Sequence, residues 1–282
     1  EDEEQLDKVL EVRERLPQLQ RIVVFDMEGL GQFKDEQVLS LEALRERGRA
    51  FDAAHPGEFD RRCASCKPED LAILVYTSGT TGKPKGAMHL HGALTWTLRQ
   101  IGIGLPQMEG DERMCFLPLC HIAERMIGAF SSIYAGSILN FVENPDTVPE
   151  NVREIAPTIF FAVPRVWEKF YSAVVIGVKE ASRIQQLAYG WGIGVGTRIA
   201  DLVLAGQPVP ASLQWQFRVA RFIALDNVRK LLGIHRARYL LTGAAPISPE
   251  LIRWYMALGL PMLEGWGMTE TCAIGTINRP DG

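Results

Sequence analysis

The chain has 282 residues, of which 47% are hydrophobic and 23% charged, as in an ordinary globular protein rather than a disordered or fibrous one. Its 34 acidic and 30 basic side chains leave a formal net charge of −4, so no overall field draws it to nucleic acid or to an anionic bilayer. The length fits one large domain or two. Any anion that this protein binds must therefore be held by a local site.

The cysteines and the apolar stretches indicate where the protein resides. Five cysteines, odd in number and irregular in spacing, do not make a disulfide framework and predict a reducing, cytoplasmic environment. Cys63 and Cys66 lack a second pair at zinc spacing, so we expect free thiols there. The longest uncharged stretch, residues 126–142, contains serines and is too short to cross a bilayer as a helix. We expect no transmembrane segment, while peripheral contact with a membrane stays open.

Hydrophobic periodicity predicts alternating helices and strands in the first part of the chain. We expect a helix over residues 4–16, a strand over 21–26, a second helix over 39–49 and a polar connection over 55–68. The continuous apolar run 71–76 then predicts a strand that is buried on both faces.

The rest of the chain continues this alternation. Further strands are expected over residues 114–117, 137–142, 158–163, 237–242 and 261–265, with helical patterns between most of them. Strands separated by helices are typical of parallel pairing, because a parallel connection needs a crossover. The predicted fold class is α/β, with mainly parallel β-sheet layers sandwiched by helices.

Several short patterns predict where helices begin and end. Thr147 and Glu150 have the spacing of a capping box, and Ser248 before Pro249 predicts another helix start, ended by Gly259. Residues 167–205 look mostly helical and are followed by a break at 206–210. Glycines 192, 194 and 196 in that stretch follow no strand, so they predict close helix packing rather than a dinucleotide site.

The stretch 76–86, Tyr-Thr-Ser-Gly-Thr-Thr-Gly-Lys-Pro-Lys-Gly, is the most informative in the chain. Hydroxyl groups, glycines and two lysines directly after a strand are suited to surround a polyphosphate with N–H groups, hydroxyls and positive charge. The spacing is not that of a Walker A loop, because Pro84 stands where Gly-Lys-Ser/Thr is required. The alternative is an ordinary mobile surface turn.

Four other segments accompany this loop in a fixed order. They are Leu-Pro-Leu-Cys-His-Ile-Ala-Glu-Arg at 117–125, Val-Pro-Arg-Val-Trp-Glu-Lys at 163–169, Leu-Thr-Gly-Ala-Ala-Pro at 241–246 and Glu-Gly-Trp-Gly-Met-Thr-Glu-Thr at 264–271. Together with the loop they resemble the signature segments of the adenylate-forming, AMP-binding superfamily, and in particular of its long-chain fatty acyl-CoA synthetases. The resemblance implies the large-domain fold of those enzymes and an AMP-forming long-chain fatty acid:CoA ligase that uses ATP, Mg²⁺ and CoA.

The resemblance also implies roles for single residues. Residues of the loop would hold the β- and γ-phosphates of ATP, namely Thr77, Ser78, Gly79, Thr80, Thr81, Gly82 and Lys85. Thr269 and Glu270 would be catalytic, with Thr269 at the α-phosphate and Glu270, together with Thr80, at Mg²⁺. A hard cation prefers oxygen ligands, which makes a carboxylate beside phosphate oxygens a sensible magnesium site. An isolated Glu after Thr would otherwise be an ordinary surface residue.

The remaining expected site residues surround the base and the acyl group. Those on the adenine side are Gly243, Ala244, Ala245, Glu264, Gly265, Trp266 and Gly267. Trp266 either stacks on the purine or is a buried core residue. His121 either lies near the carboxylate as a catalytic residue or is a hydrogen-bonded structural histidine. Trp167 is by resemblance near the acyl tunnel, although an aromatic on a helix is more often part of the core.

The same resemblance implies a domain organisation. Residues 1–282 would be part of the AMP-binding large domain, with a lead-in region over 1–70 and nucleotide- and acyl-binding subdomains over 71–282. The ribose-binding Asp, the hinge and the small C-terminal domain with its catalytic Lys would lie outside this chain, which alone would not be fully competent. Two other functions stay open: an acyl-AMP ligase that loads a carrier protein, and a non-catalytic lipid-binding or interaction fragment. Neither chain-length preference nor oligomeric state follows from the sequence.

Overall fold

A computed structural model describes residues 1–78 and 82–279, which form two compact units, 1–66 and 67–282. The first unit pairs two short parallel strands, β1 and β2, with helices. Its elements are α1 (Glu3–Val12), β1 (Ile22–Val24), β2 (Val38–Ser40), α2 (Leu41–Ala54) and α3 (Glu58–Ser65). Asp2 and Ser40 cap α1 and α2 by accepting from the amides of Gln5 and Ala43. The expected polar connection over 55–68 was wrong in part, because it contains helix α3.

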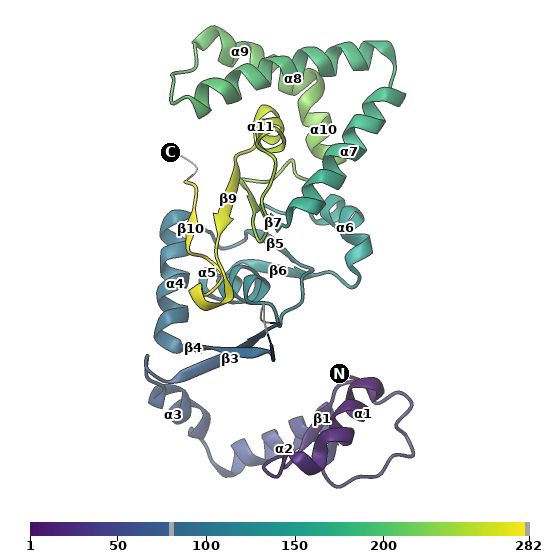
Figure 1. The fold of residues 1–282 in the computed structure, drawn as a ribbon, viewed down its shortest axis with the longest axis vertical. Coiled ribbons are helices and arrows are strands. Elements are labelled where there is room, and N and C mark those ends of the chain that lie inside the picture. The colour runs from purple at the N-terminus through teal and green to yellow at the C-terminus, as the bar shows by residue number, and fades with distance from the viewer. Residues whose placement is uncertain (79–81, 280–282) are drawn as a thin grey trace. The chain divides into compact units, whose positions relative to one another are not determined.

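The second unit contains three sheets and most of the helices (Figure 1). Its strands are β3 (Leu71–Thr77), β4 (Lys85–Leu90), β5 (Glu112–Cys115), β6 (Ile138–Phe141), β7 (Ile159–Ala162), β8 (Tyr239–Thr242), β9 (Met262–Trp266) and β10 (Thr276–Ile277). Its α-helices are α4 (His91–Gly104), α5 (Ser131–Ala135), α6 (Val148–Ile155), α7 (Pro164–Glu180), α8 (Arg183–Leu204), α9 (Ala211–Ala220), α10 (Asp226–Leu231) and α11 (Pro249–Ala257). Two π-helical segments, η2 (Glu124–Phe130) and η4 (Arg221–Leu225), precede α5 and α10.

Most strand pairs are parallel, as the α/β fold class predicts. β7, β8 and β9 pair in parallel, with Ala162, Thr242 and Glu264 in register, and β10 adds to β9 antiparallel. β5 and β6 form a separate parallel pair. In Figure 1 the helices α6, α7, α10 and α11 lie around the strands of the larger sheet. The predicted mainly parallel α/β architecture is confirmed.

The strand over 71–77 differs from its prediction. Within the described part of the chain β3 pairs with β4 alone, an antiparallel strand that was not expected, and the two form a hairpin. Val75 is buried against α4 and η2, whereas Leu71, Leu74 and Tyr76 are exposed. Burial on both faces was therefore wrong, because a two-stranded hairpin has one covered face and an apolar run does not reveal this.

Some of the predicted helix boundaries are confirmed and others are wrong. Residues 167–205 form two helices, α7 and α8, and Ser182 begins α8 with an unpredicted capping box to Gln185. The capping box at Thr147 was wrong, because its hydroxyl donates to Asn144 O at 2.8 Å instead. Ser248 is the N-cap residue of α11 but its hydroxyl makes no capping bond. Gly259, at φ +79°, ends α11 as predicted.

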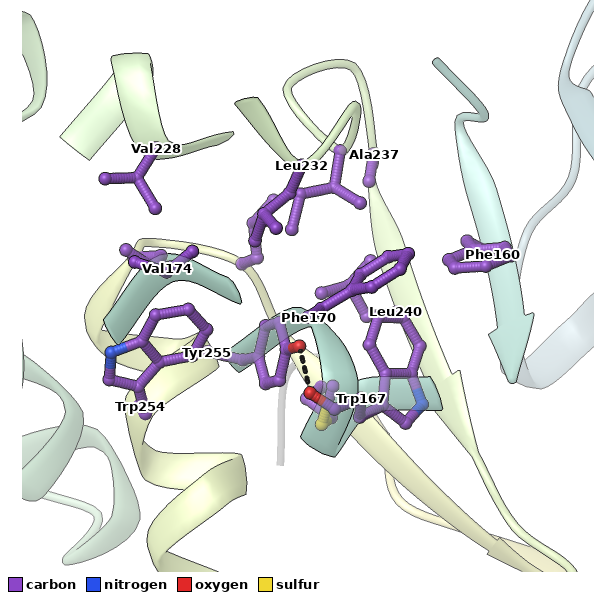
Figure 2. Close-up of a cluster of buried hydrophobic side chains, with 14 of the residues drawn as sticks. Phe160, Trp167, Phe170, Val174, Val228, Leu232, Ala237, Leu240, Trp254 and Tyr255 are labelled. Atoms are coloured by element: carbon purple, nitrogen blue, oxygen red, sulfur yellow. Dashed lines mark hydrogen bonds between the residues drawn. The ribbon is translucent and has the colours of Figure 1, made fainter. Parts of the chain in front are cut away.

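The main core fills the space between α7, α11 and one face of the larger sheet (Figure 2). Trp167 is fully buried, packs edge-on against Phe160 and Tyr255, and donates its indole N–H to Ala162 O at 3.0 Å. The Tyr255 hydroxyl donates to Trp167 O at 2.9 Å. Burial of such an aromatic side chain contributes about 1.5–3 kcal/mol. Trp167 is therefore part of the core, the second of its two alternatives.

Glycines in α8 let α11 approach closely, as the sequence predicts. A Cβ on Gly196 would lie 1.9 Å from Ala257 O, and one on Gly192 would lie 3.3 Å from the side chain of Leu225. A backbone oxygen cannot move aside as a side-chain tip can. Close packing therefore accounts for Gly196, against α11, and for Gly192, against η4, whereas Gly194 makes no such contact.

We expect Gly196→Ala to destabilise the protein by about 1–3 kcal/mol, because α8 and α11 must separate to admit the methyl group. Gly194→Ala is the matched control on the same helix, since a Cβ there meets nothing within 4 Å. The control should be neutral or gain up to about 1 kcal/mol from helix propensity. Urea unfolding of both variants measures the difference, and equal stabilities would contradict this account of the packing.

Candidate functional site

A cavity of about 540 Å³ opens at the carboxyl ends of β8 and β9. Open α/β folds place their ligands at this edge, because the loops that leave parallel strands converge there. The cavity has a polar part and an apolar part. The polar part contains residues from three segments far apart in the sequence: Thr77, Ser78 and Lys85; Thr242, Gly243 and Ala244; and Gly265, Gly267, Thr269 and Glu270.

The first segment is the tip of the β3–β4 hairpin. Thr77 and Lys85 are paired residues at the ends of the two strands, so the phosphate-loop candidate is the connection between them. Gly82 has φ +104°, a conformation that favours glycine. Gly79, Thr80 and Thr81 lie outside the described residues, and the expected roles of these three residues remain predictions. The described part already supplies hydroxyl donors and the exposed Lys85 ammonium, which suit an anion.

The segment that contains Gly267, Thr269 and Glu270 is the turn 267–273 after β9. A Cβ on Gly267 would lie 1.9 Å from Ala273 O, so only glycine permits this turn. The Met268 amide donates to the Thr271 hydroxyl at 3.0 Å, which closes a short 3₁₀ turn over Thr269–Thr271. The exposed carboxylate of Glu270 is thereby held on the wall of the cavity.

A buried contact joins this turn to the hairpin. His89 on β4 is almost fully buried, and its Nδ1 lies 3.2 Å from Cys272 Sγ, two residues beyond Glu270. Burial lowers the pKa of His89, although the charge of Glu270 opposes the shift. Burial also raises the pKa of the Cys272 thiol. Both groups are therefore neutral near pH 7, and the contact ties the two polar segments of the cavity together without a buried charge.

The segment that contains Thr242, Gly243 and Ala244 is the loop after β8, on the expected adenine side. A Cβ on Gly243 would lie 2.9 Å from Gly265 O, so the two strand ends approach to backbone contact. Ala244 has φ +67°, and Cys272 and Ala273 also adopt positive φ values. Non-glycine residues in this region are strained, and such strain concentrates at functional sites.

Three residues expected on the adenine side do not line this cavity. Ala245, Glu264 and Trp266 are exposed near its rim. Trp266 is 60% exposed, so its alternative as a buried core residue was wrong. Its ring also lies against Gly275, where a Cβ would be 2.7 Å from the indole.

His121 lies on the cavity wall after β5. Its Nδ1 accepts from the Ala123 amide at 3.2 Å, so in the neutral ring Nε2 carries the hydrogen. The bond fixes the ring orientation, and the exposed side chain presents a donor. The structural alternative for His121 is thus observed, and it leaves Nε2 as an unused donor on the cavity wall.

Sequence reasoning missed the apolar part of the cavity and one charge within it. The apolar wall comes from α4, the segment before and within η2, and the inner face of the sheet, through Ile101, Leu105, Ile122, Ala123, Ile127, Phe161, Leu241, Ile274 and Ile277. Ile122, Ala123 and Leu241 stand within the segments 117–125 and 241–246, but no motif marks them as part of an apolar wall, and only the fold brings them together with the others. Arg113 on β5 also lines the cavity and was not singled out, because the predicted strand began after it.

The structure also bears on the cysteine pair, on metal binding, on membrane-spanning helices and on a second cavity. Cys63 and Cys66 are free and exposed, as predicted. Within residues 1–78 and 82–279, no group of three or more His, Cys, Asp or Glu side chains is placed to hold a metal ion. Across the same residues, none of the helices combines the length and the apolar character needed to cross a bilayer. A second cavity of about 530 Å³, lined by residues of α7, α8 and α11, includes Arg165, Glu168 and Arg253.

Solved structures with a similar fold are adenylate-forming enzymes. The anthranilate CoA ligase AuaEII in complex with anthranoyl-AMP matches 99% of this chain and 42% of its own, with a TM-score of 0.57 and 21% identity. The N-terminal domain of FACL13 from Mycobacterium tuberculosis matches 90% of this chain and 50% of its own, with a TM-score of 0.54 and 22% identity. At these identities the likeness defines the class of fold, that of the adenylate-forming enzymes.

The sequence comparisons define the family. The model of the AMP-binding enzyme family matches residues 1–282, and the chain belongs to that family. A putative fatty-acid–CoA ligase, fadD11, of Mycobacterium tuberculosis is 34% identical over 79% of this chain and 39% of its own length. The long-chain-fatty-acid–CoA ligase ACSBG2 of Xenopus laevis is 32% identical over 100% of this chain and 38% of its own. The chain thus spans about two fifths of the length of these relatives.

We expect Gly267→Ala to weaken AMP binding by at least about tenfold, equivalent to about 1.4 kcal/mol, because the turn that carries Thr269 and Glu270 must open to relieve the contact with Ala273 O. Calorimetric titration with AMP measures the affinity. Gly104→Ala is the control, since a Cβ at the end of α4 meets nothing within 4 Å. An unchanged affinity in a folded Gly267→Ala protein would show that the turn does not shape the site.

Proposed function

We propose that the protein containing this chain activates a long-chain fatty acid in two steps. The fatty carboxylate attacks the α-phosphate of ATP to give acyl-AMP and pyrophosphate. The thiol of CoA then attacks the acyl carbonyl and releases AMP, which gives the thioester acyl-CoA. The observation that carries the proposal is the division of a single cavity into a polar part with Lys85, Thr269 and Glu270 and an apolar part of branched and aromatic side chains. An acyl adenylate has the same two halves.

Charge neutralisation is the main requirement of the first step. We assign Thr77, Ser78 and Lys85, with residues 79–82, to the β- and γ-phosphates, and Thr269 to the α-phosphate. Glu270, with Thr80, would hold Mg²⁺, and the exposed carboxylate beside hydroxyl donors fits a hard cation that also binds phosphate oxygens. The bound cation would neutralise part of the charge on the phosphates.

The base and the carboxylate have distinct places in this assignment. Gly243, Ala244 and Ala245, with Glu264, Gly265 and Gly267, would surround the adenine, because small residues leave its ring access to the backbone. Trp266 is 60% exposed, and we assign its ring to stacking on the purine. His121 would donate from Nε2 to a carboxylate oxygen and so orient it toward the α-phosphate.

The exposed cysteines and the relatives bear on the cellular setting and on the acyl acceptor. Cys63, Cys66 and Cys120 are exposed free thiols, which suit a reducing compartment, and we propose a cytoplasmic protein. CoA is the proposed acceptor, since the fadD11 and ACSBG2 relatives carry the name of CoA ligases.

Glu270→Gln tests the assignment most sharply, because it preserves size and removes one charge. In the complete protein we expect fatty acid-dependent pyrophosphate release to fall at least about tenfold across a magnesium titration, a loss of about 1.4 kcal/mol of transition-state stabilisation. The melting temperature should hardly change, since the side chain is exposed.

Glu109→Gln provides the control, as it removes an exposed carboxylate that does not line the cavity. Two results would count against the proposal. Absence of pyrophosphate release from the unmodified protein with any fatty acid, from medium to very long chain, would reject the activity. Full activity of Glu270→Gln at every magnesium concentration would instead reject only the role of this residue.

A further inference from the structure

Arg113 is a charged residue in the apolar part of the cavity. It is 4% exposed, and it lines the cavity together with Phe161 and Leu241 of the neighbouring sheet. Arginine is almost never buried to this degree unless it is paired. The position is unexpected in a pocket for a plain hydrocarbon chain, which offers a guanidinium nothing to bind.

The protein satisfies this guanidinium only in part. Its Nη1 donates to the carbonyl oxygen of Ile127 in η2, whereas the buried Nε–H finds no acceptor among the described residues. Burial lowers the pKa of Arg113 to about 10, with Asp111 and Glu124 opposing the shift, so the side chain is charged near pH 7. Among the described residues the charged guanidinium thus donates to a single acceptor, and the residue lines the cavity.

The neighbouring carboxylates are engaged elsewhere. Asp111 accepts from the Met108 amide at 2.8 Å and the Thr158 hydroxyl at 2.7 Å, and it forms an ion pair with Arg238. Glu124 accepts from the Leu117 amide at 3.2 Å. These groups balance the charge of Arg113 without supplying an acceptor for its Nε–H.

The chemistry of the missing partner follows from these contacts. A guanidinium has donors only, so the partner must present an acceptor oxygen. Asp111 and Glu124 are buried carboxylates that already balance the charge of Arg113, so a further negative charge there would be unfavourable. A neutral oxygen, as in a hydroxyl or keto group, satisfies the donor without adding charge. The ligand of the apolar part would therefore carry such an oxygen along its chain.

We propose that Arg113 is a specificity-determining residue that selects fatty acids bearing a hydroxyl or keto oxygen within the acyl chain. The inference rests on the proposed function, which it deepens by naming the substrate class. A plain chain offers this guanidinium no acceptor, whereas an oxygenated chain does. Sites built to hydrogen-bond a substrate oxygen discriminate strongly against analogues that lack it.

The test compares fatty acids of one chain length that are plain, hydroxylated near the carboxylate, hydroxylated at mid-chain, hydroxylated near the methyl end, or dicarboxylic. Two readouts are taken with the complete protein: direct binding by calorimetry without ATP, and kcat/KM for pyrophosphate release. We expect at least one hydroxy acid to bind, and to react, about tenfold or more better than the plain acid.

The variants separate a specificity role from a structural one. Arg113→Met alone would leave Glu124 buried without a counter-charge, so Arg113→Met/Glu124→Gln removes both charges and keeps the acceptor for the Leu117 amide. The double variant should bind plain and hydroxy acids equally. Arg99→Met, which removes an exposed arginine of α4, should keep the preference.

Each outcome decides the inference. Equal binding of plain and hydroxy acids at all positions, or a preference that survives in the double variant, would overturn it. A preference for the dicarboxylic acid would overturn the choice of a neutral oxygen. If no acid supports pyrophosphate release while the hydroxy acid still binds through Arg113, the proposed function fails and the selectivity of the cavity stands.

Discussion

The site depends on backbone contact between the ends of β8 and β9 and within the turn that follows. Neighbouring strands lie about 4.8 Å apart, so the loops that leave them come into close contact. The close contact is possible because two residues have no Cβ: Gly243, which lies against Gly265 O, and Gly267, which lies against Ala273 O. Because these contacts are backbone to backbone, they fix the positions of Thr269 and Glu270 more firmly than side-chain packing would. The buried His89–Cys272 contact then ties the hairpin to the same turn.

Much of the fold could be predicted from the sequence because its strongest signals are local. The runs that became β5, β7, β8 and β9 are short and apolar, and their alternation with helices specifies parallel pairing. The strand over 71–77 was found, but its exposed face was not, because burial depends on which elements cover the strand. Thr147 shows the same limit on a smaller scale: the spacing of a capping box was present, yet the local turn directed the hydroxyl to Asn144.

The polar part of the site was more accessible to sequence reasoning than the apolar part. Residues such as Thr77, Lys85 and Glu270 stand in contiguous motifs, and the fold brings all three motifs to one cavity. The apolar wall is built from single residues of α4, η2 and β7, whose types are those of any core. Arg113 could have been noticed as a charge beside an apolar run, but its burial on the cavity wall follows only from the placement of β5 against η2.

The account's central claim is that the hairpin, the loop after β8 and the turn after β9 bind one ligand together. Hydrogen–deuterium exchange of the complete protein, with and without a non-hydrolysable acyl-adenylate analogue, tests this claim most directly. We predict slower exchange in all three segments, Lys85–Leu90, residues 243–245 and residues 267–273, while the core helix α7 is unchanged. Slowing confined to one segment, or to the second cavity beside Arg165 and Arg253, would contradict the account.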